Sequence, residues 1–174
     1  MTFSDFVPLV CDLAEPDATF VADAGGTMFT VAQAIKIRDQ QRLILPGAQS
    51  CMGWSLPAAI GAAFVNHSRV YAFTGDGSVM MNLQELETLR HLHLPVKLFI
   101  VNNGGYGCIK DTQTRLCGGR LIGVGTGCGL SFPEFSKVAA AFDLPFYRLL
   151  LQEPIVGLES ALLESGPCVI EVVT

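Results

Sequence analysis

One aspartate and a pair of asparagines, each set among glycines, are the residues of this sequence with the clearest chemical potential. Asp76 stands in a Gly-Asp-Gly-Ser sequence, and Asn102 and Asn103 follow it after the 24 residues 78–101. Carboxylate and carboxamide oxygens are ligands for hard cations such as Mg²⁺. Glycines beside them leave backbone N–H groups free to approach an anion closely. Together these residue types suit a cation that carries phosphate groups.

The spacing between the two motifs predicts how they lie relative to each other. It fits a strand-end turn, one helix of about four turns and a return strand, since a whole parallel crossover takes on the order of 30 residues. Ser78 is placed to cap that helix. Both motifs then lie at the carboxyl edge of a parallel sheet, where open α/β sheets bind their ligands.

Strand-like and helical patterns alternate along the chain, which predicts an α/β fold. The apolar, β-branched or aromatic runs are Thr19–Ala22, Arg42–Leu45, Val70–Phe73, Val96–Val101, Phe146–Leu150 and Val169–Val173. The helical patterns are Phe3–Leu13, Met28–Lys36, Leu56–Val65, Asn82–His91, Phe132–Phe142 and Ile155–Glu164. Near-continuous apolar strands separated by helices are typical of a mostly parallel sheet covered on both faces. We therefore expect one three-layer α/β/α domain with about six strands.

Two segments have a more specific interpretation. In the helix after Asp76, leucines recur at every third position (83, 86, 89 and 92), which predicts one apolar face laid on the sheet. The segment Arg115–Leu130 contains six glycines and is too glycine-rich for an ordinary helix. A long irregular segment in a compact domain is usually functional or disordered. Because it closely follows Asn103, we expect it to act as a lid.

Composition indicates which kinds of partner and which cellular location to expect. Half of the 174 residues are hydrophobic and only 16% are charged, so part of the surface is expected to be covered by another chain or domain. A net charge of −5 with scattered basic residues argues against nucleic acid as the main partner. The longest strongly apolar run, Ala58–Val65, is too short to cross a membrane. The first twelve residues lack the features of a signal peptide, and the six cysteines form no CxxC pair, so we expect a cytoplasmic protein.

The two motifs resemble the signature of enzymes that depend on thiamine diphosphate. The segment Cys51–Gly61 is similar to the one that precedes this signature in the acetolactate synthase and 2-oxo acid decarboxylase group. Asp23–Gly25 resembles the opening of the same domain, and Gly166-Pro167 resembles its ending. The resemblance covers residues 1–174 as the diphosphate-binding (PP) domain alone. It implies the corresponding thiamine diphosphate-binding fold.

The resemblance also assigns roles to individual residues. It implies that Mg²⁺ is coordinated by the side chains of Asp76 and Asn103 and by the backbone carbonyl of Gly105. Met52 resembles the bulky residue that forces the two cofactor rings into a V shape. The carbonyl near Ser50 would receive the amino group of the aminopyrimidine, although the family more often has glycine there. The full set of implied cofactor contacts is Gly26, Thr27, Ser50, Met52, Gly75, Asp76, Gly77, Ser78, Asn103, Gly105, Tyr106 and Gly107.

The same resemblance implies what this chain does not supply. The glutamate that activates the cofactor belongs to a separate pyrimidine-binding (PYR) domain, so we expect no catalytic residue here and no activity without that domain. The PYR domain would come from a partner chain in a homo- or hetero-oligomer or from missing N-terminal domains. The implied chemistry is attack of the activated cofactor on a 2-oxo acid, loss of CO₂ and capture of the product carbanion. Decarboxylases often have a catalytic acid where Ile109 stands, which favours carboligation.

Two alternatives remain open at this point. One is the small subunit of a split 2-oxo acid decarboxylase of the sulfopyruvate or phosphonopyruvate type, although Asn102 points toward the synthase group. The other is a catalytically silent binding module, which predicts lost metal ligands, whereas Asp76 and Asn103 are intact. A nicotinamide-binding Rossmann domain and a P-loop nucleotide site are excluded because neither fingerprint is present.

Overall fold

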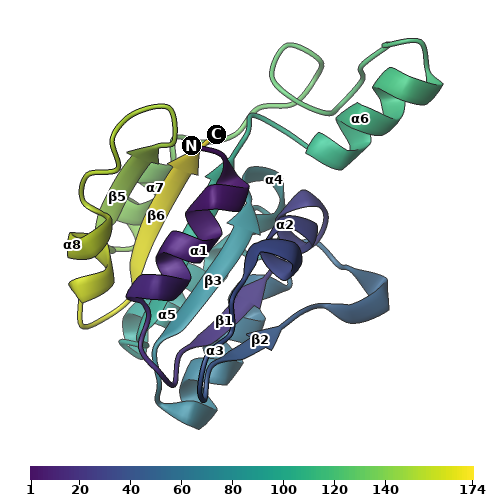
Figure 1. The fold of residues 1–174 in the computed structure, drawn as a ribbon. Coiled ribbons are helices and arrows are strands. Elements are labelled where there is room, and N and C mark those ends of the chain that lie inside the picture. Colours follow the sequence, from purple (N-terminus) through teal and green to yellow (C-terminus); the bar gives the residue numbers. More distant parts are fainter.

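Six parallel strands form a single sheet, which is the middle layer of the molecule (Figure 1). The structure, a computed structural model, describes residues 1–174. The strands are β1 (Thr19–Ala22), β2 (Arg42–Ile44), β3 (Val70–Gly75), β4 (Val96–Asn102), β5 (Phe146–Leu150) and β6 (Cys168–Val173). Every pair of neighbouring strands is parallel, in the order β2-β1-β3-β4-β6-β5. The predicted α/β fold with a six-stranded sheet is confirmed.

The strand order reverses direction between β1 and β3. The chain leaves β1 toward β2 on one side, and then β3 and β4 continue the sheet on the other side. The connections after β1 and β3 therefore leave the carboxyl edge in opposite directions. Such a switch point is where open parallel sheets leave a crevice for a ligand.

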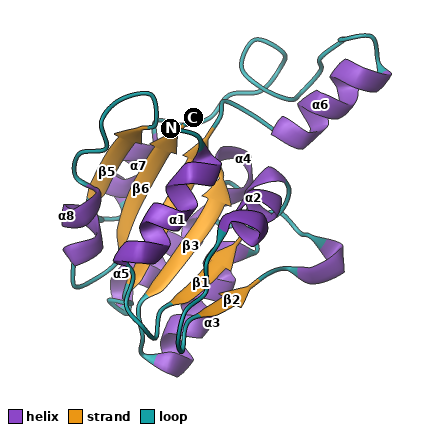
Figure 2. Ribbon diagram, in the orientation of Figure 1, coloured by secondary structure: helices purple, strands orange, loops and turns teal.

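Helices cover both faces of the sheet, as Figure 2 shows. One face is covered by α1 (Phe3–Leu13), α2 (Gly26–Ala34) and α8 (Leu158–Leu163). The other face is covered by α3 (Ser55–Asn66), α5 (Leu86–His91) and α7 (Phe135–Ala141). The remaining helices are α4 (Asp76–Val79), α6 (Gly107–Leu116) and the 3₁₀ turns η1 (Gly47–Gln49) and η2 (Leu83–Glu85).

Successive side chains of each strand point to opposite faces of the sheet, which divides the core into two layers. Phe20, Tyr71, Phe73 and Phe99 point to the α1 face, where Phe73 and Phe99 stack with their centroids 4.8 Å apart. The intervening strand residues are smaller aliphatic ones and pack under α3, α5 and α7. Burying each aromatic side chain contributes about 2–3 kcal/mol relative to leaving it exposed. These side chains hold the central strands together and fix the sheet edge that carries the site.

The connection between β3 and β4 differs from the single helix predicted for it. It consists of α4, η2 and α5, with Asn82 in a non-helical conformation between the first two. The side chain of Asn82 donates a hydrogen bond to the carbonyl of Gly53, which ties the chain to another loop at this point. Leu86 and Leu89 are buried as expected, whereas Leu92, beyond the end of α5, is 44% exposed.

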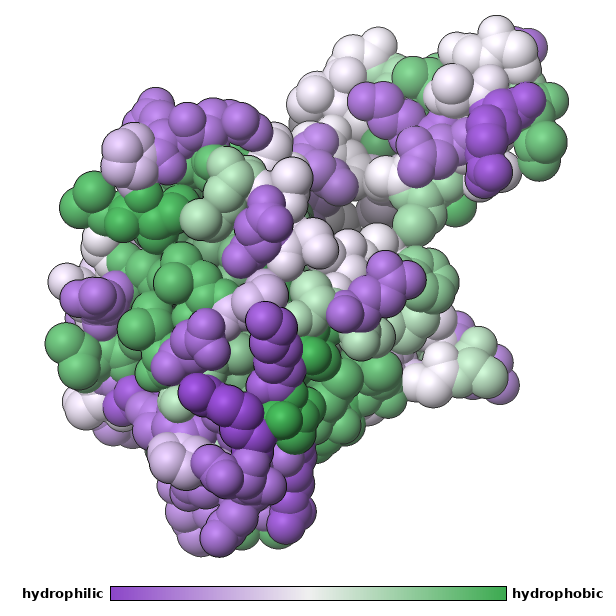
Figure 3. Space-filling model, viewed as in Figure 1, coloured by the Kyte–Doolittle hydropathy of each residue, from purple (hydrophilic) through white to green (hydrophobic).

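Two other features of the helices differ from the sequence-based predictions. Ser78 does not cap the helix after β3, because it lies inside α4, Gly75 takes the N-cap position, and no side chain caps that helix. The helix α6 was not predicted at all. None of its residues is buried, so it has no apolar stripe that a pattern could reveal. Figure 3 shows α6 and the loop after it as an arm that stands away from the body.

Candidate functional site

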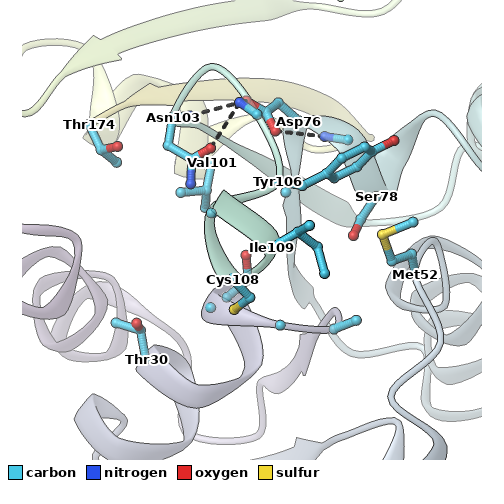
Figure 4. A pocket seen from close by; sticks show the side chains of 18 of the residues that line it. Thr30, Met52, Asp76, Ser78, Val101, Asn103, Tyr106, Cys108, Ile109 and Thr174 are labelled. Carbon is cyan, nitrogen blue, oxygen red and sulfur yellow. Dashed lines mark hydrogen bonds between the residues drawn. The ribbon is translucent and has the colours of Figure 1, made fainter. Parts of the chain in front are cut away.

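A cavity of about 520 Å³ opens at the switch point of the sheet. Its walls come from the turns after β1, β3 and β4, from the loop before α3 and from the start of α6. All 12 residues predicted to contact a cofactor line it, namely Gly26, Thr27, Ser50, Met52, Gly75, Asp76, Gly77, Ser78, Asn103, Gly105, Tyr106 and Gly107. In Figure 4 the side chains of Met52, Ser78 and Ile109 point toward the same space from three different elements.

Asp76 is the most constrained polar side chain of this cavity. It is only 2% exposed, and its Oδ1 accepts a hydrogen bond from the N–H of Gly77 at 2.7 Å. Its Oδ2 accepts from the N–H groups of Asn103 at 3.2 Å and of Gly105 at 3.0 Å. Burial raises the pKa of this carboxyl, and the backbone hydrogen bonds act against that rise. Burial makes the ionised form of this carboxyl costly, and a cation beside it would favour that ionised form.

The turn after β4, residues 102–107, brings two further oxygen donors to the cavity. The side-chain oxygen of Asn103 accepts a hydrogen bond from Gly105 N–H at 3.2 Å, and the carbonyl of Gly105 accepts one from Gly107 N–H at 3.1 Å. Each of these oxygens, and the carboxylate of Asp76, keeps a lone pair for another ligand. A carboxylate, a carboxamide and a carbonyl form an all-oxygen donor set of the kind that Mg²⁺ prefers. The residues present therefore fit a hard cation.

Glycines shape the part of the cavity next to Asp76. A side chain at Gly77 would overlap the aromatic ring of Tyr106, which lies directly against that glycine. The Tyr106 ring is held in turn by an edge contact with Phe132, at a centroid distance of 6.2 Å. A backbone without side chains can approach the oxygens of a diphosphate closely. The cavity wall thus fits a phosphate-bearing ligand beside the cation donors.

Asp23, which the sequence analysis did not assign to the site, anchors the loop that carries Met52. Its carboxylate is fully buried and accepts from the N–H groups of Gly53 at 3.0 Å and Ser55 at 3.1 Å. It also accepts from the hydroxyls of Ser55 at 2.8 Å and Thr74 at 3.2 Å. Thus one side chain joins the ends of β1 and β3 to this loop. The signal in the sequence was a charged residue directly after a short, mostly apolar strand.

Ser50 adopts the left-handed conformation, with φ 44° and ψ 51°. This conformation costs about 1 kcal/mol for a residue that has a Cβ atom, whereas glycine adopts it freely. The geometry gives a physical reason why glycine suits this position. The side chain of Ser50 lies at the cavity, with its hydroxyl 3.8 Å from the sulfur of Met28.

The glycine-rich segment after α6 forms a strap, defined here as residues 117–130, against the turn after β4. The carbonyl of Val124 accepts a hydrogen bond from the N–H of Tyr106 at 2.8 Å, and Gly105 and Gly125 form an antiparallel bridge. Because the N–H and C=O of a trans peptide point in opposite directions, this bond sets the direction of the Gly105 carbonyl. The side chain of Gln113 secures the strap through two hydrogen bonds to the backbone of Ile122.

A glycine-walled cavity at the switch point of a parallel sheet, with oxygen donors on the strand ends, defines a domain that binds a phosphorylated ligand. The profile of the family described as "Thiamine pyrophosphate enzyme, C-terminal TPP binding domain" matches residues 23–172. The chain therefore belongs to the thiamine pyrophosphate (thiamine diphosphate) enzymes, as the cofactor-binding PP domain of the acetolactate synthase group.

Curated relatives share this assignment. The chain is 32% identical over 168 residues to the acetolactate synthase isozyme 1 large subunit of Escherichia coli (strain K12), covering 94% of this chain and 29% of the relative. It is 32% identical over 151 residues to the acetolactate synthase of Mycobacterium avium, covering 86% and 24%. With the acetolactate synthase large subunit of Pyropia yezoensis it shares 34% identity over 134 residues, covering 76% and 22%. The chain thus spans less than a third of the length of these relatives.

None of the eight α-helices combines the length and the apolar character that crossing a bilayer requires.

Proposed function

We propose that this domain holds thiamine diphosphate through a Mg²⁺ ion bound by the side chains of Asp76 and Asn103 and the carbonyl of Gly105. The observation that carries the proposal is the buried carboxylate of Asp76, which faces the cavity and binds the backbone of the turn that supplies the other two donors. Gly77 and Ser78 would contact the diphosphate, and Gly26 and Thr27 line the opposite turn.

The domain contributes binding and orientation rather than the bond-breaking step. Thiamine diphosphate supplies an electron sink for the carbanion formed when a 2-oxo acid loses CO₂. Met52 enters the cavity from a loop that Asp23 and Asn82 fix on either side of the Gly53 peptide. A loop held in this way is suited to placing Met52 against the cofactor, because orientation errors of about 1 Å already slow catalysis strongly.

The reaction we propose is an acetolactate synthase-like carboligation of 2-oxo acids. Its support is the name of the relatives and the aliphatic side chain of Ile109, which lines the cavity and cannot relay a proton as a decarboxylase acid does. Decarboxylation by a split enzyme would instead require an acid at this position or from a partner. The catalytic glutamate would come from a PYR domain, either in a partner chain or elsewhere in a longer polypeptide.

The arm supports the proposal of a partner. The helix α6 buries none of its residues, and it and the following loop expose Ile109, Leu116 and Ile122. Apolar side chains on an arm beside the cavity fit a surface that a PYR domain covers. The assignment of residues 1–174 as the PP domain alone belongs to this proposal, and the cytoplasmic location stays a prediction.

Calorimetric titration with thiamine diphosphate, with and without Mg²⁺, tests the cofactor site. We expect binding that requires the cation, because the diphosphate and the ionised Asp76 carboxylate repel each other without it. Equal affinity in the presence of a chelator would overturn the assignment of Asp76, Asn103 and Gly105 as cation ligands.

Replacing Gly125 with alanine tests the role of the strap. The new Cβ would lie 2.7 Å from the carbonyl oxygen of Gly104, so the strap must move off the turn after β4. We expect the Mg²⁺ concentration needed for half-maximal cofactor binding to rise roughly tenfold, the effect of losing one well-placed hydrogen bond. Gly61→Ala in α3, where a Cβ meets open space, is the matched control. A Gly125→Ala protein with the Mg²⁺ dependence of the unmodified chain would show that the strap does not position Gly105.

A further inference from the structure

Besides the side chain of Asn103, two other side chains hold the backbone of the turn after β4. The N–H groups of Asn103 and Gly105 donate to Asp76. The N–H of Gly104, which lies between them in the chain, donates instead to the side-chain oxygen of Asn102 at 3.1 Å. Asn102 therefore holds the middle peptide of the turn whose flanking residues supply two of the proposed cation ligands.

The side-chain amide of Asn102 can accept from Gly104 and donate to Glu171 in only one of its two orientations. Its Nδ2 donates to Oε1 of Glu171 at 2.6 Å, while its Oδ1 accepts from Gly104. An ionised carboxylate only accepts hydrogen bonds, so Asn102 must turn its NH₂ group toward Glu171 and its oxygen toward Gly104. The reverse orientation would place donor against donor at Gly104 and acceptor against acceptor at Glu171.

Glu171 is itself fixed by the sheet. It lies in β6, is only 6% exposed, and stands between Ile100 of β4 and Arg148 of β5 in the parallel register. Its second oxygen, Oε2, is 3.2 Å from Nε of Arg148. A buried carboxylate is costly unless it is paired. Arg148 offsets its charge on one oxygen, and the other oxygen is left to orient Asn102.

We propose that Glu171 is a positioning residue for the cation site, acting through Asn102 on the peptide of Gly104. The proposal rests on the proposed function, because it concerns the same cation ligands. Glu171 does not touch the cavity, and 69 positions separate it from Asn102 in the chain. Its carboxylate sets which atom of Asn102 faces the turn, and the turn sets where Asn103 and Gly105 present their oxygens.

A double-mutant cycle on the Mg²⁺ dependence of thiamine diphosphate binding tests this path. The variants are Glu171→Met, Glu171→Gln, Asn102→Ala and the double variant Glu171→Met/Asn102→Ala, compared by calorimetry under conditions where all are folded. We expect Glu171→Met and Asn102→Ala each to raise the half-saturating Mg²⁺ concentration roughly tenfold. Glu171→Gln should stay within about twofold of the unmodified chain, because its carbonyl oxygen can still accept from Asn102. The double variant should be no weaker than Asn102→Ala alone, since residues that act through one path are not additive.

Arg148→Ala separates positioning from general stability. Arg148 contacts only Oε2, so its loss is expected to lower the free energy of unfolding without changing the Mg²⁺ dependence. A shift in Arg148→Ala equal to that of Glu171→Met, or full additivity in the cycle, would overturn the proposal.

Hydrogen exchange of the Gly104 amide gives a readout that does not depend on the cation. We expect faster exchange of this amide in Glu171→Met and in Asn102→Ala than in the unmodified chain. Unchanged exchange in Glu171→Met overturns the positioning role even if Mg²⁺-dependent binding is confirmed. If the unmodified chain binds the cofactor without a cation, the proposed function fails, while the exchange data still decide whether Glu171 orients Asn102.

Discussion

Replacing Asp76 with alanine is expected to abolish Mg²⁺-dependent binding of thiamine diphosphate, with an affinity loss of at least about 100-fold. The substitution removes the one charged cation ligand and leaves the N–H groups of Gly77 and Asn103 without an acceptor, while the N–H of Gly105 loses one of its two acceptors. An interaction with a charged group contributes about 1.5–3 kcal/mol, and here a second effect adds to it because the turn that carries the other ligands loosens. Calorimetric titration with the cofactor at saturating Mg²⁺ measures the loss.

Two further variants make this measurement specific. Asp76→Asn keeps the size of the side chain and one oxygen but removes the charge, so we expect an affinity between those of Asp76→Ala and the unmodified chain. Asp17→Ala removes an exposed aspartate that precedes β1, at the opposite edge of the sheet, and should leave binding unchanged. Circular dichroism confirms that each variant is folded. Metal-independent affinity in Asp76→Ala equal to that of the unmodified chain would refute the site.

The purified chain is expected to bind its cofactor but to form no acetolactate from pyruvate until a PYR-domain protein is added. A missing general acid or base alone lowers a rate by a factor of about 10²–10⁴. Acetolactate formation, measured for the chain alone and after mixing with candidate PYR-domain chains from the same organism, tests this expectation.

The control for the second experiment is the Asp76→Ala chain mixed with the same partner, which should remain inactive. Restored turnover with the unmodified chain and none with the variant would show that this chain supplies the cofactor. Steady acetolactate production by the unmodified chain alone, at a rate that the partner does not increase, would contradict the division of the active site between two domains.

The meeting of the two motifs at one edge of the sheet was predictable from the sequence, because neighbouring parallel strands end at the same edge. Motifs at the ends of neighbouring parallel strands must meet at one edge, and Gly75, the first residue of one motif, pairs with Val101, which directly precedes the other. The strands were predictable because four of the six are buried along most of their length and are largely apolar.

What could not be predicted depends on contacts between distant residues or on the absence of burial. The amphipathic pattern of a helix reports its packing, and α6 buries none of its residues. Asn82 interrupts the helix after β3 because of a hydrogen bond to Gly53, 29 positions away. The glycines of the strap indicated an irregular segment, but its contact with Gly105 has no local signature. Likewise, the sequences around Asn102 and Glu171 contain no pattern that would predict the hydrogen bond between their side chains.

The hydrogen bonds of Asp23 have a consequence for the order of folding. They close chain separations of 30, 32 and 51 residues, so they form only after β1 and β3 have paired and the intervening crossover has docked. Closing loops of this length costs conformational entropy before the contacts between distant residues have formed. A partly folded chain therefore has no finished cavity for the cofactor. Thiamine diphosphate then stabilises only the fully folded state, by mass action, and cannot template the folding of the chain around it.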